Sequence, residues 1–501
     1  HTVAAGGGSI CQFDGVKLAV GPESSGADPG PACYGRGGPL SVTDINLFLG
    51  RIVPSRFPFP LDRAAVRRKL ETLCDEIADS PLGHRYTPIE LADGFLQIAN
   101  ANMTRAIRRI SVAKGYDPAD YALVTFGGAG AQHACAIAEA IGIKTVLVHP
   151  FAGILSAYGI GLADVRRFGQ QSVLKPYSAE TLQEIEPLFE ELESNALAEV
   201  QAEGIADENI GQPLRSLDMR YQGVETTINV PYGDDADSAA QYQQMHQRLY
   251  GYVHENRAIE ITAARVEVVG RTAATAAETV KPQHRVPEPT ETVSTWFGGT
   301  EHNTGVFLRE HLQAGDGIAG PAIVCEPTST IVIDPGWKAT VTERGEVVIG
   351  CEQSLPTASG RTSTGTVPPV AAGGLSTSAD PVLLEIFNNL FASIAEQMGI
   401  TLQQTSISTN VKERLDFSCA IFDPDGELVV NAPHIPVHLG AMSETVKRVI
   451  ADNPQIQPGD VFVTNDPYRG GSHLPDVTIV TPVFDPQFSL LFFTASRAHH
   501  A

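Results

Sequence analysis

The stretch ALVTFGGAGAQHACAIAEAIGIKTVLVH, residues Ala122–His149, decides the fold of the first part of the chain. Two short apolar runs, at 122–126 and 144–149, enclose a glycine-rich segment at 127–130 and an alanine-rich segment with helical periodicity. This order of strand, loop, helix and strand is typical of a βαβ unit. The sequence therefore predicts an α/β fold with parallel strands here.

The loop inside this stretch, FGGAGAQHA at 126–134, has two interpretations. Glycines let the backbone approach a ligand closely, and N–H groups at the start of the next helix favour an anion or a nucleotide. Because the loop matches neither a G-x-G-x-x-G nor a Walker sequence, a tight turn is the simpler explanation of the loop on its own. The segment HTVAAGGGSI at 1–10 has the same two interpretations.

The regions around the βαβ unit differ in their patterns. A capping box, with Thr87 as N-cap and Glu90 reaching back to it, predicts the start of a helix that runs toward Gly115. A long acidic helix at about 179–204 precedes alternating strands that continue to Gly350. We therefore expect a helix and β-rich accessory region at 171–351, after a first domain at 1–170.

Residues 352–380 consist almost entirely of Ser, Thr, Gly, Pro and Ala. Such a segment cannot bury enough apolar surface to order itself, so it is predicted to be a flexible linker. A new α/β domain is expected at 381–501, where an amphipathic helix is followed by a hairpin that turns at Asp425-Gly426.

The composition excludes some classes of function. A formal charge of -23 and a pI near 5.0 oppose binding to nucleic acid. Seven scattered cysteines without C-x-x-C spacing indicate neither disulfides nor a zinc knuckle, and favour a reducing cytoplasm. The least charged region, 121–163, is interrupted by Glu139 and Lys144, so we expect no membrane span.

A second dense stretch, NDPYRGGSHLPDV at Asn465–Val477, precedes two apolar runs at 477–484 and 489–496 that predict a hairpin. With the turn centred between Pro486 and Gln487, antiparallel pairing places Asp476 opposite Arg497. His499 then lies two positions beyond that pair, and His473 lies three residues before Asp476. The hairpin therefore brings two imidazoles and a carboxylate to one end of a sheet.

Several long motifs resemble those of a known family. HTVAAGGGSI, GPESSGADPGPACYGRGG, SVTDINLFLGR and TFGGAGAQHACAIAEAIGI resemble the hydantoinase A/oxoprolinase family, whose nucleotide domain is similar to actin, sugar kinases and Hsp70. NVKERLDFSCAIFDPDGELV, HIPVHLGAM, PGDVFVTNDPYRGGSHLPDVTIV and SRAHH resemble the hydantoinase B family. The resemblance implies the C-terminal part of an actin/Hsp70-like ATPase domain, an accessory region, and the start of a hydantoinase B-type domain.

The resemblance also implies an activity, because both halves occur on one polypeptide as in the fused oxoprolinases. It implies ATP- and Mg²⁺-dependent hydrolysis of the cyclic amide of 5-oxo-L-proline, by a cytoplasmic enzyme that is a homo-oligomer at full length. Nucleotide contacts are implied for the two loops, at Gly6, Gly7, Gly8, Gly127, Gly128, Ala129 and Gly130. The family's phosphate loops would lie upstream of His1, so we expect a piece of a longer polypeptide that binds ATP weakly by itself.

Two imidazoles and a carboxylate suit Zn, Mn or Fe rather than calcium. Metal ligands at matching positions of the related carboxylases favour a metal bound by His473, Asp476 and His499. The alternative is that His473 caps a turn and Asp476 begins a strand. His500 competes with His499, which is preferred because the family pattern Arg-Ala-His-x-Ala-Asp keeps its first His.

Further candidates are weaker. Asp416 and His438 could serve in acid–base catalysis, but a solvated ion pair and an ordinary loop histidine explain them as well. Cys419 lies in an apolar strand without a base nearby and is expected to be an inert thiol. Rival functions are an N-methylhydantoin hydrolase, a ketone carboxylase and a non-catalytic assembly module.

Overall fold

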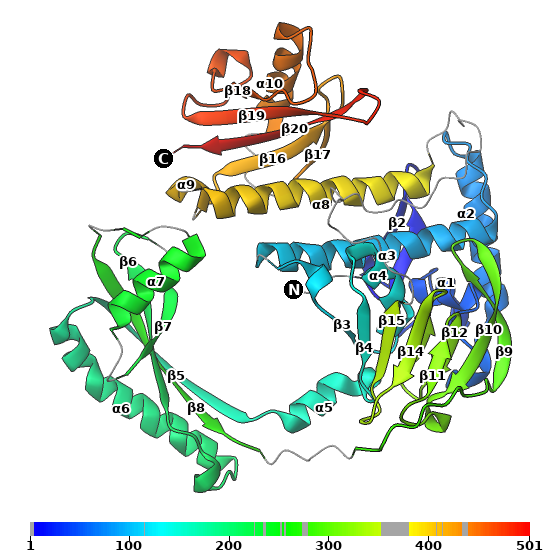
Figure 1. The fold of residues 1–501 in the computed structure, drawn as a ribbon, viewed down its shortest axis with the longest axis horizontal. Coiled ribbons are helices and arrows are strands. Elements are labelled where there is room, and N and C mark those ends of the chain that lie inside the picture. Colours follow the sequence, from blue (N-terminus) through cyan, green and yellow to red (C-terminus); the bar gives the residue numbers. More distant parts are fainter. Residues whose placement is uncertain are drawn as a thin grey trace. The chain divides into compact units, whose positions relative to one another are not determined.

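The computed structural model describes residues 5–114, 116–224, 226–233, 237–250, 253–254, 257–272, 279–351, 380–406, 408–412, 414–432 and 439–500. The chain forms two compact units (Figure 1). Unit 1 contains residues 1–156 and 277–397, and unit 2 contains 157–276 and 398–501. The fold is α/β, as the sequence predicted.

The predicted βαβ element is present in unit 1. Strands β3 (Leu123–Thr125) and β4 (Thr145–Val148) are parallel, and helix α4 (Ala134–Ile141) connects them. Gly142 ends the helix in the left-handed conformation, which glycine adopts without steric cost. The five-stranded sheet runs in the order β11 (Gly317–Ala319), β14 (Trp337–Val341), β15 (Val347–Cys351), β4, β3.

The strands after residue 279 lie in unit 1, whereas the strands between 165 and 270 lie in unit 2. β15 pairs directly with β4, and Val347 lies opposite Val148. A neighbouring four-stranded sheet has the order β13 (Thr330–Ile333), β12 (Ala322–Cys325), β10 (Thr300–Leu308), β9 (Glu291–Phe297). Alternation predicts a strand but not the sheet it joins, because a β pattern carries no information about its partner.

Helices pack into a second core of unit 1, against the hairpin of β1 (Ser9–Phe13) and β2 (Leu18–Ser24). They are α1 (Val42–Phe48), α2 (Arg63–Asp79), α3 (Pro88–Ala113) and the start of α8 (Pro381–Thr405). The predicted capping box of α3 is confirmed, since the Thr87 backbone N–H donates to Glu90 Oε2 and the Glu90 N–H donates to Thr87 Oγ1.

The accessory part of unit 2 follows the short helix α5 (Leu155–Leu162). Helix α6 (Ala179–Ala202) buries Phe189 and Val200 in a core with a four-stranded sheet. The strands run in the order β5 (Val165–Pro176), β8 (Ile259–Gly270), β6 (Leu214–Tyr221), β7 (Ile228–Tyr232), and α7 (Ser238–Tyr250) precedes β8.

The remaining part of unit 2 carries the candidate site. Its five-stranded sheet runs β17 (Leu428–Asn431), β16 (Phe417–Phe422), β20 (Leu490–His499), β19 (Asp476–Phe484), β18 (Phe462–Thr464). Helix α10 (Leu439–Asp452) packs on it through Met442 and Val446, and α9 (Thr409–Lys412) precedes β16. No helix in the described ranges is long and apolar enough to cross a bilayer.

The β19–β20 hairpin has a different register from the predicted one. Asp476 pairs with His499 instead of Arg497, a shift of two residues. One residue comes from a longer turn, because the Asp485 N–H donates to the Ser489 carbonyl and Phe488 adopts a φ of 64°. The other comes from an irregularity at Val483/Phe484. Beyond this irregularity, the shift of two keeps the side chains on their predicted faces.

Candidate active site

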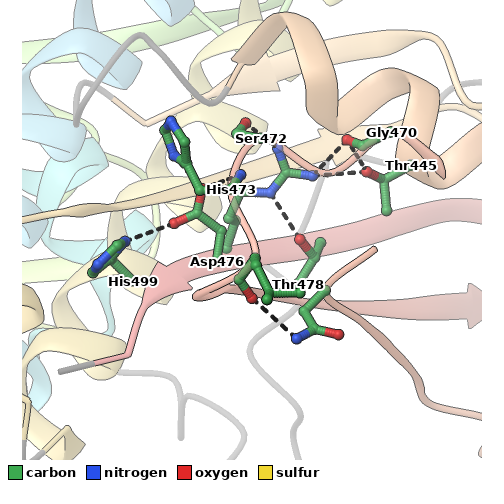
Figure 2. A network of polar contacts seen from close by, with 10 residues as sticks. Thr445, Gly470, Ser472, His473, Asp476, Thr478 and His499 are labelled. Carbon is green, nitrogen blue, oxygen red and sulfur yellow. Dashed lines mark hydrogen bonds and ion pairs between the residues drawn. The ribbon is translucent and has the colours of Figure 1, made fainter. Parts of the chain in front are cut away.

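Asp476 lies between two imidazoles at the end of the β19–β20 hairpin (Figure 2). Its Oδ2 accepts from the backbone N–H of His473 at 3.0 Å and lies 2.9 Å from Nδ1 of the same residue. Its Oδ1 lies 2.9 Å from Nδ1 of His499. Asp476 is fully buried, whereas the side chains of His473 and His499 are 61% and 30% exposed. The structure thus brings all three predicted metal ligands together.

The geometry sets the form of both rings. An ionised carboxylate only accepts hydrogen bonds, so each Nδ1 carries the proton that it donates to Asp476. In the neutral ring, the Nε2 atom then bears a lone pair, which can accept a proton or bind a metal. Two oriented Lewis bases therefore project from one buried acid.

The donor set fits a divalent transition metal by its chemistry, because imidazole and carboxylate ligands suit Zn, Mn and Fe. In the part of the chain that the structure describes, however, no group of three or more His, Cys, Asp or Glu side chains has the arrangement of a metal site. Asp476 contacts both Nδ1 atoms, which is the position of a carboxylate that orients metal-binding histidines from behind.

The other candidate residues of this region differ in their positions relative to Asp476. The carbonyl of Asp416 accepts from the backbone N–H of His499 at 3.2 Å, so Asp416 lies at the same end of the sheet. The backbone N–H of His500 donates to the Pro475 carbonyl. His438 falls outside the described residues. Cys419 is buried, and burial raises the pKa of its thiol to about 11, in keeping with the expected inert thiol.

Sequence reasoning missed the role of Arg497, which is fully buried behind the Asp476–histidine group. Its guanidinium donates to oxygens of Thr478, Ser472, Thr445 and Gly470 at 2.7 to 3.0 Å. Burial lowers the pKa of Arg497, and the negative charge of Asp476 opposes that shift. The signal in the sequence was an arginine within an alternating apolar strand, at a position that faces the core.

The two glycine-rich loops of unit 1 meet. A Cβ placed on Gly7 would lie 3.5 Å from the Cβ of Ala129 and 2.8 Å from Thr43 Oγ1. Thr43 Oγ1 donates to the Gly7 carbonyl, which ties the first loop to α1. A Cβ on Gly130 would lie 2.8 Å from Thr125 Oγ1. The predicted nucleotide contacts therefore come from one tightly packed pair of loops.

The four other glycines of the two loops differ in their surroundings. The Gly128 carbonyl accepts from the Thr330 N–H, and the Gly127 N–H donates to the Ala152 carbonyl. Gly127 has a φ of 88°, where glycine avoids strain. A Cβ on Gly8 would meet Ser24 Oγ at 2.8 Å, whereas one on Gly6 would meet nothing within 4 Å.

His133, at the end of the 127–130 loop, was not singled out from the sequence. It is 2% exposed, and its Nδ1 lies 2.8 Å from Asn100 Oδ1 of α3 while its Nε2 lies 3.4 Å from Asn46 Nδ2 of α1. Burial, with a smaller contribution from the charge of Arg51, lowers the pKa of His133 to about 4. The ring is therefore neutral, and its contacts hold the loop against α1 and α3.

A cavity in unit 1 has a volume of about 700 Å³. It is lined by residues of the β1–β2 hairpin, α3 and α8, among them Lys17, Arg105 and Glu385. None of the residues that the sequence singled out as site candidates lines it.

Three family models match consecutive parts of the chain. Residues 1–168 match the hydantoinase/oxoprolinase model, residues 175–345 match the hydantoinase/oxoprolinase C-terminal domain, and residues 380–501 match hydantoinase B/oxoprolinase. Over its whole length the chain is 44% identical to 5-oxoprolinase 1 of Arabidopsis thaliana and 39% identical to 5-oxoprolinase of Saccharomyces cerevisiae. It spans about 40% of the length of each of these relatives.

Two solved structures are similar to this one. Nucleotide-free acetone carboxylase aligns with a TM-score of 0.58 at 20% identity, over 69% of this chain and 52% of its own. At that identity the likeness concerns the fold alone. The ATP-dependent caprolactamase from Pseudomonas jessenii aligns with a TM-score of 0.57 at 29% identity, over 70% of this chain and 52% of its own.

Proposed function

Because this chain belongs to the hydantoinase/oxoprolinase family, we propose that the protein containing it hydrolyses the ring amide of 5-oxo-L-proline to L-glutamate in an ATP-dependent reaction. The observation that carries the proposal is the similarity to oxoprolinases, which extends over both the nucleotide-loop region and the Asp476 site. The unpaired state of all seven cysteines supports a reducing, cytoplasmic compartment.

The chemistry explains the need for ATP. An unstrained lactam resists water, and transfer of the γ-phosphoryl group to the amide oxygen makes the ring carbon more electrophilic. Water then adds to that carbon, and the C–N bond breaks as the ring nitrogen takes up a proton, which gives an open-chain acyl phosphate. A second water hydrolyses this acyl phosphate and releases phosphate and the amino acid. Positioning and Mg²⁺-assisted neutralisation of charge supply most of the phosphoryl-transfer step.

In unit 1, the paired loops are proposed to hold the nucleotide. Gly7 and Ala129 approach so closely that a side chain on Gly7 would fill the space between them. The backbone N–H groups of Gly128, Ala129 and Gly130 precede α4, where they can donate to a ligand, whereas the Gly127 N–H already donates to the Ala152 carbonyl. The residues Gly6, Gly8 and Gly128 complete this proposed cradle.

In unit 2, His473 and His499 are proposed to act through Nε2 while Asp476 holds their Nδ1 protons. A divalent metal bound by this group would polarise the substrate carbonyl or a water molecule. The chain's own contribution is to orient the two rings through their Nδ1 atoms. Asp416 at the same sheet end, and His438, are proposed to move protons during ring opening.

The histidines provide the test. Full-length protein with His473→Ala or His499→Ala should lose bound Zn, Mn or Fe by elemental analysis, and should lose glutamate formation while retaining part of its ATP hydrolysis. His500→Ala is the matched control, because its N–H faces Pro475 and its neighbour His499 stays intact. Unchanged metal content in His473→Ala would exclude the metal assignment.

A second candidate function is ATP-dependent hydrolysis of another ring amide, which the similarity to caprolactamase favours. Assays with 5-oxoproline, N-methylhydantoin and caprolactam, each with ATP, separate these substrates. Bicarbonate-dependent ATP consumption would indicate a ketone carboxylase instead. Failure of the intact protein to hydrolyse ATP with any of these compounds would favour an assembly role.

A further inference from the structure

Arg497 sits at the junction of four segments of unit 2. Nη2 donates to Thr445 Oγ1 of α10 at 2.7 Å and to the Gly470 carbonyl at 3.0 Å. Nη1 donates to Ser472 Oγ at 2.9 Å, and Nε donates to Thr478 Oγ1 of β19 at 2.7 Å. The arginine itself belongs to β20, where Thr478 is its direct ladder partner. One buried cation therefore joins a helix, two strands and the loop that leads to His473.

The four contacts just described all join the guanidinium to neutral oxygens. Asp476 adds a negative charge that acts on the buried guanidinium. Both side chains are 0% exposed. The arginine and the imidazole-binding carboxylate thus form one buried charge system below the exposed histidines.

The loop that Arg497 holds has little room to move. Gly470 has a φ of 88°, and a Cβ there would lie 2.4 Å from the backbone nitrogen of Thr445. A Cβ on Gly471 would lie 2.6 Å from the Asp466 carbonyl. Thr445 Oγ1 also donates to the Gly470 carbonyl at 2.6 Å. The backbone of Gly470 therefore packs closely against α10, and the backbone of Gly471 packs closely against Asp466 in the same loop.

We propose that Arg497 is a positioning residue for the hydrolytic site. By donating hydrogen bonds to Gly470, Ser472 and Thr478 at once, it fixes the position of His473 relative to His499. This inference rests on the proposed function of that histidine pair. Arg497 does not face the substrate, because its guanidinium is enclosed and His473 and His499 are the exposed groups. Arg497 acts through the loop that contains Gly470 and Ser472. Thr445 contacts both Gly470 and Arg497, and so ties this loop to α10.

The planar guanidinium group of arginine makes these simultaneous hydrogen bonds possible. Five N–H donors in a fixed plane reach several oxygens at once, whereas a lysine ammonium reaches fewer and lacks the plane. Arg497→Lys therefore keeps the charge near Asp476 but loses the simultaneous contacts. Arg497→Ala loses both, and leaves a space that free guanidinium ion can enter.

The test uses the full-length protein and two measurements. In Arg497→Lys and Arg497→Ala, we expect kcat for ring opening to fall by roughly 10–100-fold, as for other groups that orient ligand side chains. KM should change little. Hydrogen exchange followed by mass spectrometry should show faster exchange in peptides covering 470–477, with β16 and β20 unchanged, and guanidinium should restore part of the rate in Arg497→Ala.

Arg448→Ala is the matched control, because Arg448 forms an exposed ion pair with Asp452 of the same unit, and it should change neither measurement. Unaltered exchange at 470–477 would overturn the proposal. So would exchange that rises over the whole sheet without rescue, since that result indicates a general structural role. If the wild-type protein opens no lactam, the proposed function fails, and the exchange data still decide whether Arg497 holds the loop.

Discussion

Asp476 and His499 face each other directly across the β19–β20 ladder, with Oδ1 of the acid 2.9 Å from Nδ1 of the ring. His473 approaches the other carboxylate oxygen from the preceding turn. The acid is buried and the rings reach solvent, so the charge that orients the imidazoles is shielded from water. This relationship is the structural basis of the site proposed at the end of the hairpin.

Asp476→Asn should disrupt the site and the local fold. Asparagine has one acceptor oxygen, so it cannot accept from both Nδ1 atoms, and Arg497 loses its buried counter-charge. Leaving a buried polar group without its hydrogen-bond partner costs about 1–3 kcal/mol. Hydrogen exchange of β19 and β20 peptides should rise accordingly. Asp452→Asn, in an exposed pair, should cost less than about 1 kcal/mol. Equal effects in both variants would contradict this account.

Gly470→Ala should impair turnover and stability, because an added Cβ meets the backbone of α10 at 2.4 Å and the φ of 88° disfavours a side chain. Gly440→Ala is the control, since nothing lies within 4 Å of a Cβ there and alanine favours a helix by about 1 kcal/mol. Stability by urea unfolding and turnover of 5-oxoproline are measured for both variants. A fully active Gly470→Ala protein would show that the loop can move away from α10.

Gly7→Ala should weaken nucleotide binding by the full-length protein more than Gly6→Ala. The new Cβ at residue 7 would press on Thr43 Oγ1 and fill the space toward Ala129, whereas a Cβ at residue 6 meets no atom within 4 Å. Equilibrium titration with a non-hydrolysable ATP analogue measures the difference. Equal affinities would place the nucleotide away from these loops.

The burial of His133 should lower the free energy of unfolding of unit 1 in mild acid. Its pKa is lowered to about 4 in the folded state, so between pH 6.5 and 4 the unfolded chain binds more protons at this residue. The stability due to the neutral ring is complete above about pH 6.5 and is lost as the pH falls toward 4, by about 3 kcal/mol in total.

His133→Gln should flatten this dependence, because glutamine does not titrate. Urea unfolding at several values between pH 7.5 and 4.5, followed by exchange of α4 peptides, provides the measurement. A pH dependence of equal slope in both proteins would assign the acid sensitivity to other groups.

The sequence determined much of the local structure. The βαβ element at 122–149 follows from its apolar periodicity, and the capping box fixes the start of α3 because Thr87 and Glu90 satisfy each other's backbone N–H groups. The hairpin at 476–499, and the choice of His473, Asp476 and His499 as a group, also follow from sequence, since alternation decides which side chains share a face.

Only the tertiary structure decided the rest. The register of the hairpin depended on a three-residue turn with Phe488 at positive φ and on an irregularity at Val483/Phe484, and neither has a glycine signal. The sheet that β15 joins, the burial of Arg497 and the enclosure of His133 depend on contacts between distant segments. Local patterns fix an element's type and face, but burial and partners are set by which other elements cover it.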